Sequence, residues 1–307
     1  MPSTFVIVGP TAVGKTDISL ALAQLLENEH GLAEIVNADS MQLYRGMDIG
    51  TAKLPVSQRR GIVHHMLDVL DVTATATVSD YQSQARDTIA AIHGRGRHAV
   101  VVGGSGLFVN ALLDDMQFPA SDEQVRTRLE MEARSVGSQV LYDRLFQADP
   151  HAAKNLVPTN TRRVIRALEV LEITGSAPST SLGDLAEVIP AIRIGLRRER
   201  HEIDSRIEAR VENMWTLGFV DEVERLLDLG LSRGVTASQA LGYKQLIAAH
   251  EGRSSLAEAK QLTVAGTRRY VRRQDSWFKR DRKITWFDAA TVKPADLLAL
   301  APRIDPS

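Results

Sequence analysis

Short, largely apolar runs separated by amphipathic segments organise the first third of the chain. The runs at Phe5–Val8, Ala33–Asn37 and His98–Val102 have the length of strands, and the first is too short for a membrane span. Runs this continuous are typical of parallel strands that are buried on both faces. We therefore predict a parallel sheet whose strands are linked by helices.

Two helices are predicted between these strands. The first follows a glycine-rich turn after the first strand and carries apolar side chains at Ile18, Leu22, Leu25 and Leu26. The second is expected to begin at an N-cap, Ser79, and to end at Gly94. Its apolar positions recur at helical spacing and share one face, at Tyr81, Ala85, Ile89 and Ile92.

After the third strand the pattern changes to helices alone. One helix is capped by residues 121–123 and ends near Gly137, and another runs from an N-cap at Asn160 to Gly175. The stretch Ser176–Gly183 is rich in Ser, Thr and Pro, which indicates a loop.

The last third of the chain returns to a mixture of strands and helices. Strands are predicted at Ala191–Leu196 and Lys283–Phe287. Long helices are predicted between and around them, at about 199–217, 219–229 and 256–279.

Composition narrows the class of protein. The chain has 307 residues, enough to bury a large core, and 44% hydrophobic and 24% charged residues are ordinary for a globular protein. It contains no cysteine, which excludes disulfides, thiolate metal sites and a cysteine nucleophile. The lack of cysteine fits a reducing cytoplasm, and the N-terminus has no basic leader. We expect a cytoplasmic monomer that does not associate with membranes.

Positive charge is concentrated near the C-terminus, although the net charge of the chain is only −1. Residues 268–283 contain eight Lys or Arg and two Asp, a local sum of +6 that leaves −7 for the rest. A focused basic segment on a mildly acidic body is typical of nucleic-acid binding. Taken alone, such a run is more often a solvated helix face.

The strongest motif lies between the first strand and the first helix. It matches the phosphate-binding P-loop pattern G-x-x-x-x-G-K-[ST] with the residues Gly9, Pro10, Thr11, Ala12, Val13, Gly14, Lys15 and Thr16. The glycines let backbone N–H groups converge on phosphate oxygens, the helix N-terminus adds partial positive charge, and Lys15 adds a full one. The Thr16 hydroxyl is a candidate ligand for Mg²⁺. The motif predicts a phosphorylated ligand but specifies neither ATP nor kinase chemistry.

These observations together predict an α/β fold: a parallel-sheet core like that of the P-loop NTPases, flanked by helices, with an all-helical insertion domain. The core domain is expected to comprise residues 1–118 and 190–307 and to include the basic C-terminal helix. The insertion is expected to comprise residues 119–189.

The acidic residue that usually accompanies a P-loop is absent from its usual place. In P-loop NTPases an Asp at the end of an apolar strand organises Mg²⁺ and water. The strand that ends at Val102 leads into glycines instead, whereas the strand Ala33–Asn37 is followed by Asp39. Asp39 is therefore a candidate metal organiser or a base for an acceptor, and its simplest alternative role is a helix or turn cap.

Several segments, in the same order along the chain, resemble one family, the tRNA dimethylallyltransferases. They are the P-loop and residues 39–53, 64–68, 103–108, 162–169, 240–244 and 267–278. The run 39–53 reads Asp-Ser-Met-Gln-Leu-Tyr-Arg-Gly-Met-Asp-Ile-Gly-Thr-Ala-Lys and is peculiar to this family and its close relatives. Because the segments cover nearly the whole chain, the sequence is identified as a member of the family.

This resemblance implies an activity. Family members bind dimethylallyl pyrophosphate on the P-loop and admit tRNA from the opposite end of a channel. They transfer the dimethylallyl group to N6 of the adenine next to the 3′ side of the anticodon, in tRNAs that read codons beginning with U. The expected partners are therefore tRNA, through its anticodon stem-loop, and dimethylallyl pyrophosphate, with Mg²⁺ as cofactor. Asp39 corresponds to the general base, and Thr11, Lys15 and Arg206 to further catalytic residues.

The resemblance also assigns residues to tRNA binding. The set is Asp39, Ser40, Met41, Gln42, Ser105, Arg126, Arg162, Arg163, Val164, Ile165, Arg166, Gln239, Gly242, Tyr243, Lys244, Arg272, Arg273, Gln274, Ser276, Trp277 and Lys279. Ser105 replaces a family Thr and keeps its hydroxyl, whereas Val13 replaces a common Ser and lacks one. Asp275 stands where the family usually has an apolar residue, which bears on how much of the basic helix faces RNA.

The negative charge that grows on a leaving pyrophosphate could be stabilised by the P-loop, Lys15, Mg²⁺ on Thr16 and an arginine. Arg206 is the preferred candidate, with Arg200 and Arg210 as alternatives. Surface pairing of these arginines with Glu202 and Asp204 is an equally simple interpretation.

Aromatic and histidine residues in these segments have simpler explanations than catalysis. Tyr270, Trp277 and Phe278 could receive unstacked bases. The apolar face of an amphipathic helix explains Trp277 and Phe278 more simply. The pair His64–His65 is expected to be structural, because neighbouring strand residues point to opposite faces and no third ligand is spaced for zinc.

Three other functions fit part of the sequence. A small-molecule kinase would use the P-loop for ATP, but it leaves the basic helix and the insertion without a role. A nucleotide-regulated RNA-binding module would not need the Asp39 carboxylate. An isopentenyltransferase acting on free AMP would share the chemistry, but the basic helix and Arg162, Arg163 and Arg166 favour a substrate with many phosphates.

Overall fold

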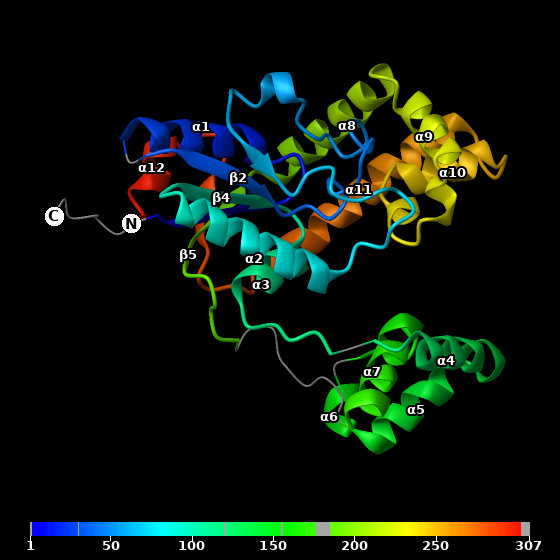
Figure 1. Cartoon of the computed structure of the whole chain (residues 1–307). Helices are drawn as coiled ribbons and strands as arrows, with labels where there is room; N and C mark the ends of the chain where they lie inside the picture. The colour runs from blue at the N-terminus through cyan, green and yellow to red at the C-terminus, as the bar shows by residue number, and fades with distance from the viewer. Residues whose placement is uncertain (1, 30, 120, 155, 176–184, 302–307) are drawn as a thin grey trace. The chain divides into compact units, whose positions relative to one another are not determined.

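The computed structural model describes residues 2–29, 31–119, 121–154, 156–175 and 185–301. Within this part the chain forms two compact units, a core unit of residues 1–114 and 187–307 and a helical unit of residues 115–186 (Figure 1). The domain boundaries predicted at 118/119 and 189/190 lie four and three residues further along the chain (118 against 114, 189 against 186).

The core unit contains a six-stranded parallel sheet in the order β3-β2-β4-β1-β5-β6. The strands are β1 (Thr4–Val8), β2 (Ala33–Asn37), β3 (His64–His65), β4 (His98–Gly103), β5 (Ala191–Arg197) and β6 (Thr285–Asp288). The strands predicted from apolar runs are confirmed. Because all strands run in parallel, the carboxyl ends of β1, β4 and β2 meet at one edge of the sheet, where ligands bind in this class of fold.

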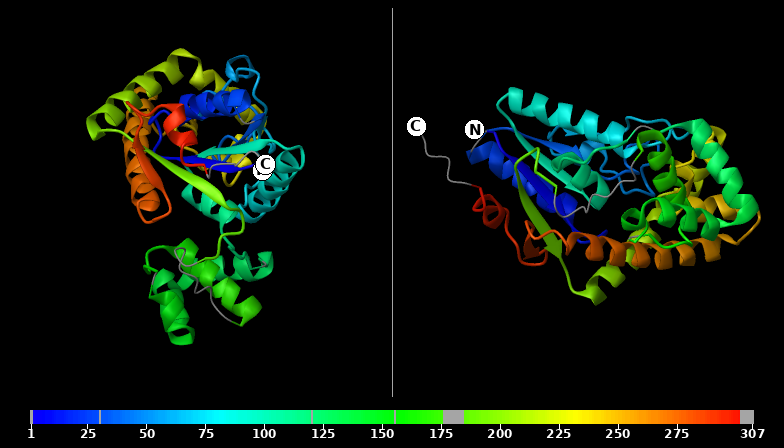
Figure 2. Two further views of the ribbon diagram at one scale, coloured as in Figure 1. Left: turned by 90° about the vertical axis from the view of Figure 1, so that its left-hand side faces the viewer. Right: turned by 90° about the horizontal axis from the view of Figure 1, so that it is seen from below.

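Helices cover both faces of the sheet. In the view from below in Figure 2, α1 (Lys15–Glu29, blue) and α12 (Pro294–Leu298, red) lie on one side of the strands and α2 (Val78–Gly94, cyan) lies on the other. Successive strand residues point to opposite faces, so Phe5 and Ile7 pack toward α1 and Val6 and Val8 toward α2. The two-sided burial explains why the strands are continuously apolar.

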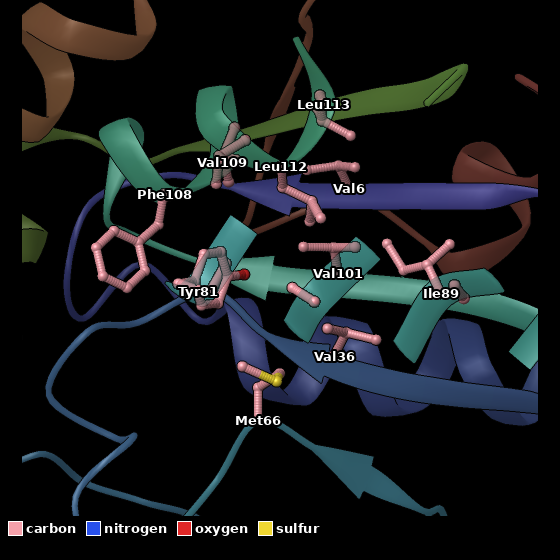
Figure 3. Packing of buried hydrophobic residues seen from close by; sticks show 14 of the residues in the cluster. Val6, Val36, Met66, Tyr81, Ile89, Val101, Phe108, Val109, Leu112 and Leu113 are labelled. Carbon is pink, nitrogen blue, oxygen red and sulfur yellow. The ribbon is translucent and has the colours of Figure 1, made fainter. Parts of the chain in front are cut away.

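The face of the sheet that α2 covers also packs against α3 (Gly106–Leu113). Figure 3 shows side chains of the strands, among them Val36 and Val101, meeting Ile89 of α2 and Leu112 of α3. The predicted apolar face of α2 is buried as expected. This packing fixes α3 and the glycine turn before it against the sheet.

The start of α2 differs from the prediction. Thr77, and not Ser79, is the N-cap: its Oγ1 accepts a hydrogen bond from the backbone N–H of Asp80 at 3.0 Å, and its backbone is extended. Ser79 lies inside the first helical turn, among the residues whose N–H groups need a cap. The helix ends at Gly94, as predicted.

A second layer of helices follows β5. It contains α8 (Arg200–Thr216), α9 (Phe219–Asp228), α10 (Tyr243–His250) and α11 (Leu256–Phe278). The three long helices predicted here are confirmed, and α10 is additional. Part of this layer has a hydrophobic cluster of its own, built around Phe219, Tyr243 and Leu246, into which Tyr44 and Met47 of the loop after β2 insert. The layer therefore supports a loop that begins at the carboxyl edge of the sheet.

The helical unit contains α4 (Glu123–Val136), α5 (Ser138–Ala148), α6 (Pro150–Ala153) and α7 (Thr161–Thr174), packed around a separate apolar core. Asp122 and Asn160 cap α4 and α7 through their side chains, as the sequence predicts. The loop predicted at Ser176–Gly183 lies outside the described residues. Among the described helices of both units, none is long and apolar enough to cross a bilayer.

Candidate active site

The P-loop joins the carboxyl end of β1 to the first turn of α1. Gly9, Ala12 and Gly14 have positive φ angles of 148°, 68° and 109°. A Cβ on Gly9 would lie 2.6 Å from the carbonyl oxygen of Leu196, so glycine is needed where the loop passes β5. Since α1 begins at Lys15, its free N–H groups face the interior of the loop, which is the arrangement that binds phosphate.

Lys15 is held over the loop by backbone carbonyl groups. Its Nζ donates to the oxygens of Gly9 at 2.8 Å and Pro10 at 2.9 Å. Burial lowers the pKa of Lys15 to about 8, against the attraction of Asp39, and the nearby Arg210 lowers it further. A bound phosphate would stabilise the charged form, so the site favours an anion at this position.

A cavity of about 480 Å³ lies above the P-loop. It is lined by Thr11, Ala12, Gly14, Lys15, Thr16, Asp17, Asp39, Gln42, Thr51, Ala52, Arg206, Ala209, Arg210 and Asn213. Its walls thus come from the P-loop, from the loop after β2 and from α8. Three cationic side chains of this lining border one space, which suits a ligand with several phosphate charges.

The three candidate arginines of α8 differ in what they contact. Arg206 lines the phosphate cavity and donates through Nε to the carbonyl oxygen of Ala12 at 2.6 Å. Arg210 also lines it and donates to the carbonyl oxygen of Thr51 at 3.2 Å, and burial lowers its pKa against the attraction of Asp39. Arg200 instead pairs with Asp204 at 3.1 Å, as the surface alternative predicted for it.

A second cavity, of about 240 Å³, adjoins the first. Its lining combines apolar and polar residues: Thr11, Asp39, Ser40, Met41, Gly50, Thr51, Arg210, Val211, Met214, Gln239, Ala240, Leu241, Tyr243, Thr263, Thr267, Tyr270 and Arg273. Four residues line both cavities, namely Thr11, Asp39, Thr51 and Arg210. The two cavities therefore meet at these side chains, and a group held in one can approach a group held in the other.

Asp39 occupies this junction in a fixed conformation. Its Oδ1 accepts a hydrogen bond from the N–H of Met41 at 2.9 Å, so the carboxylate does serve as a turn cap. The Asn37 side chain bonds both the N–H and the carbonyl of Asp39, at 3.1 and 2.9 Å. Capping and catalysis are compatible, because the capping bond uses one carboxylate oxygen and leaves the role of proton acceptor to Oδ2.

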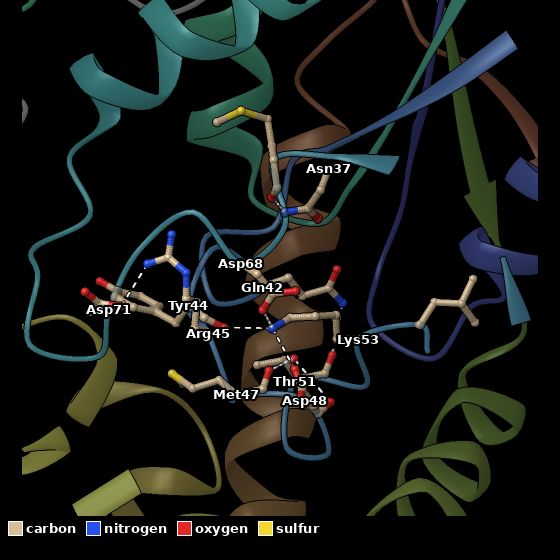
Figure 4. Close-up of polar contacts among 12 residues, drawn as sticks. Asn37, Gln42, Tyr44, Arg45, Met47, Asp48, Thr51, Lys53, Asp68 and Asp71 are labelled. Atoms are coloured by element: carbon tan, nitrogen blue, oxygen red, sulfur yellow. Dashed lines mark hydrogen bonds and ion pairs between the residues drawn. The ribbon is translucent and has the colours of Figure 1, made fainter. Parts of the chain in front are cut away.

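The loop after β2 is secured by Lys53. Figure 4 shows its Nζ between the carbonyl oxygen of Tyr44 at 2.7 Å, Asp48 Oδ1 at 2.7 Å and Asp68 Oδ1 at 2.5 Å. Only 3% of the Lys53 side chain is exposed. Lys53 belongs to the resembling run 39–53, but its anchoring role has no signal in the sequence beyond that membership.

Glu222 of α9 holds the middle of the same loop. Its carboxylate accepts from the N–H groups of Asp48, Ile49 and Gly50 at 3.1, 2.7 and 3.2 Å. It also accepts from the Tyr243 hydroxyl at 2.6 Å. Glu222 is not predictable as an anchor from the sequence, because its backbone partners lie more than 170 residues away along the chain. Together Lys53 and Glu222 fix the segment that brings Thr51 to the junction.

The residues assigned to tRNA in the loop after β2 and around α10 mostly line the second cavity. Ser40, Met41, Gln239 and Tyr243 are in its wall, Gln42 lines the phosphate cavity, and Lys244 is exposed. Ser105 lies close by, and its Oγ accepts from the N–H of Ser40 at a long 3.4 Å. Gly242 is buried with a φ of 87°, and a Cβ there would lie 2.6 Å from the Phe219 ring, so it shapes the turn before Tyr243.

The basic helix α11 has an exposed and a buried side. Arg272, Arg273, Ser276 and Lys279 are exposed. Trp277 is half-buried and donates through Nε1 to Asn110 at 2.9 Å, and Phe278 is in the core, as the simpler interpretation of this pair predicts. Asp275 is half-buried, and burial raises its pKa against nearby Lys279 and Arg200.

Gln274 is the exception among the residues assigned to tRNA on α11. It is 4% exposed, and its side chain contacts the P-loop residue Thr11 and the carbonyl of Gly104. The buried side chain is thus occupied by contacts within the protein, and the assignment of Gln274 to tRNA binding stays a prediction. Its position on the helix, four residues after Tyr270 and three before Trp277, turns it toward the sheet.

The helical unit places its assigned residues in two environments. Arg162 and Arg163 are exposed, whereas Val164 and Ile165 are 0% and 6% exposed and belong to the core of the unit. The apolar face of α7 holds Val164 and Ile165 inside the unit, and their assignment to tRNA binding stays a prediction. Arg126 and Arg166 both pair with the buried carboxylate of Glu169, at 3.0 and 2.9 Å.

One residue of the histidine pair, His65, belongs to a buried cluster of charged side chains. His65 Nε2 bonds the buried carboxylate of Glu34 at 2.5 Å, which Arg95 and Arg97 also bind at 2.8 Å. Within the described residues there is no group of three His, Cys, Asp or Glu side chains that could hold a metal ion.

The donor set at the P-loop is compatible with Mg²⁺. Mg²⁺ keeps several of its waters and is bound by one or two protein oxygens together with substrate phosphates, and it does not need an all-protein cage. Thr16, exposed at the start of α1, lines the phosphate cavity together with Asp39 and Asp17. The Thr16 hydroxyl is thus available beside the position of a bound phosphate.

A phosphate cavity and a second, less polar cavity that share a fixed carboxylate are typical of an enzyme that transfers a group from a phosphorylated donor to an acceptor. Together with the parallel sheet and the P-loop, they define a P-loop transferase.

Comparisons with known proteins identify the family within this class. The model of the IPP transferase family matches residues 42–281. A tRNA dimethylallyltransferase of Thermobifida fusca is 53% identical over 287 residues, which cover 93% of this chain and 90% of that protein. The chain belongs to the IPP transferase family, whose members named tRNA dimethylallyltransferase are prenyltransferases.

Solved structures agree with this assignment. A tRNA isopentenylpyrophosphate transferase of Bacillus halodurans has a TM-score of 0.70 and 38% identity, with 98% of this chain and 94% of that chain covered. A eukaryotic dimethylallyltransferase described as acting on tRNA has a TM-score of 0.78 and 26% identity, with 94% of this chain and 74% of that chain covered. The fold predicted from the sequence is therefore the fold of this family.

Proposed function

We propose that this protein transfers the dimethylallyl group from dimethylallyl pyrophosphate to N6 of the adenine next to the 3′ side of the anticodon, and releases pyrophosphate. The observation that carries the proposal is the position of Asp39, which lines both the phosphate cavity and the second cavity. In the proposed complex the pyrophosphate lies on the P-loop, the adenine enters the second cavity, and the reacting atoms meet at Asp39. Membership of the family supports the same assignment.

The leaving group governs the first half of the chemistry. Negative charge grows on the pyrophosphate as the allyl C–O bond breaks, and fixed positive charges that face it lower the barrier. Lys15, Arg206 and Arg210 line the cavity that would hold it. Mg²⁺ bound by the Thr16 hydroxyl and the phosphate oxygens would supply further charge stabilisation.

The acceptor governs the second half. The exocyclic amine of adenine is a poor nucleophile because its lone pair is delocalised into the ring. A carboxylate assists when it accepts the amine proton as the C–N bond forms. Asp39 is held by Met41 and Asn37 at the junction and is the candidate for this role, with Oδ2 as the accepting atom. Thr11, which also lines both cavities, is placed to orient either reactant.

A tRNA acceptor fits the surroundings of the second cavity better than free AMP. Arg273 of α11 lines this cavity, and Arg272 and Lys279 are exposed on the same helix. Independently of this cavity, the helical unit by itself carries exposed positive charge at Arg162 and Arg163. Each such residue can neutralise one backbone phosphate, which a long RNA offers and a mononucleotide does not. The adenine must leave its stack to enter, and this costs least in a single-stranded loop.

The test is transfer of labelled dimethylallyl from its pyrophosphate to tRNA that lacks the modification, in parallel with AMP, in Mg²⁺ and in EDTA. We expect label in tRNA, little in AMP, and loss of transfer in EDTA. Label in AMP alone would replace the tRNA assignment with a free-nucleotide one. No transfer by folded protein would refute the proposal, and ATP turnover by the same sample would indicate a kinase.

A further inference from the structure

One face of α11 contacts the P-loop and lines the second cavity. Tyr270, Gln274 and Trp277 follow one another at spacings of four and three residues and therefore share one face of the helix. Tyr270 lines the second cavity, near the side chains of Ser105 and Gln274. Exposed residues such as Arg272 and Lys279 lie on the opposite face. The same helix thus presents one side to the surface and the other to the P-loop.

Gln274 makes the central contact of this face. Its Oε1 accepts from the N–H of Thr11 at 2.9 Å, and its Nε2 donates to the carbonyl oxygen of Gly104 at 2.9 Å. Both functional atoms of a buried amide are therefore used, one on the P-loop and the other on the turn that follows β4. An amide fits here because one partner offers a proton and the other needs one.

The turn after β4 is shaped to accept this contact. A Cβ on Gly104 would lie 2.2 Å from Nε2 of Gln274, and a Cβ on Gly106 would lie 2.1 Å from Cδ1 of Trp277. Glycine at both positions lets α11 come close enough for its side chains to reach the backbone. The role of the glycines after β4 is therefore to make room for α11. They stand at the end of a strand where other P-loop proteins carry an acidic residue.

We propose that Gln274 is a positioning residue for the transfer reaction. Its side chain fixes the backbone of Thr11 and with it the shape of the P-loop at the two cavities. The inference rests on the proposed function, because Thr11 matters only if it borders both reactants. Gln274 does not contact the substrates in this account. It acts through Thr11, which lines both cavities, so its loss loosens donor binding and the alignment of the donor with Asp39.

The direct test is steady-state kinetics of Gln274→Met, which keeps the length of the side chain and removes both hydrogen bonds. We expect the KM for dimethylallyl pyrophosphate to rise about tenfold and kcat to fall, while the KM for tRNA stays within about twofold. Arg272→Ala is the matched control from the outer face of α11, and we expect the opposite pattern, a higher KM for tRNA and an unchanged KM for the donor. A KM for the donor that stays at the wild-type value in folded Gln274→Met would overturn the proposal, as would a rise confined to tRNA.

Gln274→Glu gives a second readout that a merely structural role would not produce. A carboxylate can accept from Thr11 but repels the carbonyl oxygen of Gly104, whereas the protonated acid can make both bonds. Burial raises the pKa of such a carboxyl group. The activity of Gln274→Glu relative to wild type should therefore increase as the pH falls. A ratio independent of pH would contradict the proposed hydrogen bonds.

Calorimetric measurement of the binding of inorganic pyrophosphate with Mg²⁺ tests the positioning role of Gln274 separately from the proposed transfer to tRNA. If wild-type protein binds pyrophosphate but transfers nothing to tRNA, the proposed function fails while the role of Gln274 is still tested. We expect Gln274→Met to bind pyrophosphate about tenfold more weakly than wild type. Equal binding by the two proteins would refute the positioning role whatever the acceptor is.

Discussion

Glu222 of α9 and Tyr243 of α10 form a buried hydrogen bond of 2.6 Å, with 2% and 0% of the two residues exposed. The same carboxylate accepts three backbone N–H groups of the loop that carries Thr51. A cluster of this kind is costly to break, because each donor left behind is buried and unsatisfied.

Substitution of Glu222 should destabilise the protein strongly. Glu222→Gln keeps the shape but turns an N–H₂ group toward donors, and we expect a loss of about 3 kcal/mol in the free energy of unfolding. Tyr243→Phe removes a single bond and should cost about 1–2 kcal/mol. Urea titration of both variants measures the two losses. A loss below about 1 kcal/mol for Glu222→Gln would mean that the loop is held by other contacts.

Lys53 should matter for activity through the same loop. Lys53→Met removes an ammonium group that makes three hydrogen bonds, on a side chain that is only 3% exposed. The loop should therefore loosen, and kcat/KM should fall at least tenfold. Arg45→Ala is a suitable control from the same loop, since Arg45 pairs with Asp71 at the surface with 56% and 75% of the side chains exposed. We expect the control to lose less than about 1 kcal/mol of stability and to retain its activity. Equal activities of the two variants would contradict the anchoring role.

The lowered pKa of Lys15 predicts a pH limit for donor binding. Lys15 is charged below its pKa of about 8 and neutral above it, and only the charged form attracts a phosphate. The phosphates of the donor are fully ionised well below this range, since their last pKa is about 6. The value of kcat/KM for the donor should therefore fall about tenfold per pH unit above pH 8, while kcat, measured with donor bound, should fall only at higher pH.

Rate measurements from about pH 6.5 to about pH 9.5 test this limit. Lys15→Arg should lose the alkaline decrease, because arginine stays charged over this range. The interpretation fails if kcat/KM is flat to the upper end of the range, or if Lys15→Arg keeps the wild-type profile.

The arginines of α8 should separate into active-site and surface residues. Arg206→Ala and Arg210→Ala each remove a charge from the phosphate cavity and should lower kcat/KM about 100-fold or more. Arg200→Ala, on the same helix but paired with Asp204, should stay within about twofold of wild type. Transfer assays at subsaturating donor distinguish these outcomes. A large effect at Arg200 with none at Arg206 would reverse the assignment.

The sequence predicted those parts of the site whose residues lie close together along the chain. The P-loop follows from one strand, one turn and one helix, and the burial of β1 follows from its own apolar run. Contacts between distant segments left no comparable signal: Gln274 and Thr11 are separated by 263 residues. Periodicity could have predicted the burial of Val164 and Ile165, since both lie on the apolar face of α7.

The error at the start of α2 has a different origin. Thr77 and Ser79 are both good capping residues, and sequence alone does not decide which of two nearby hydroxyls takes the role. The extended backbone of Thr77 and its bond to Asp80 decide it in the structure. Helix boundaries are therefore less certain from sequence than the apolar face, which was predicted correctly.

The most direct test of the whole account is a single-turnover assay of Asp39→Asn with an anticodon stem-loop and saturating dimethylallyl pyrophosphate. Asparagine keeps the oxygen that accepts from Met41 but cannot take a proton at the other position. The account predicts that the rate of transfer falls by a factor of about 10²–10⁴ while binding of the donor changes by less than about threefold. Transfer at the wild-type rate would contradict the assignment of Asp39 as the base, and with it the central claim that the two reactants meet at this carboxylate.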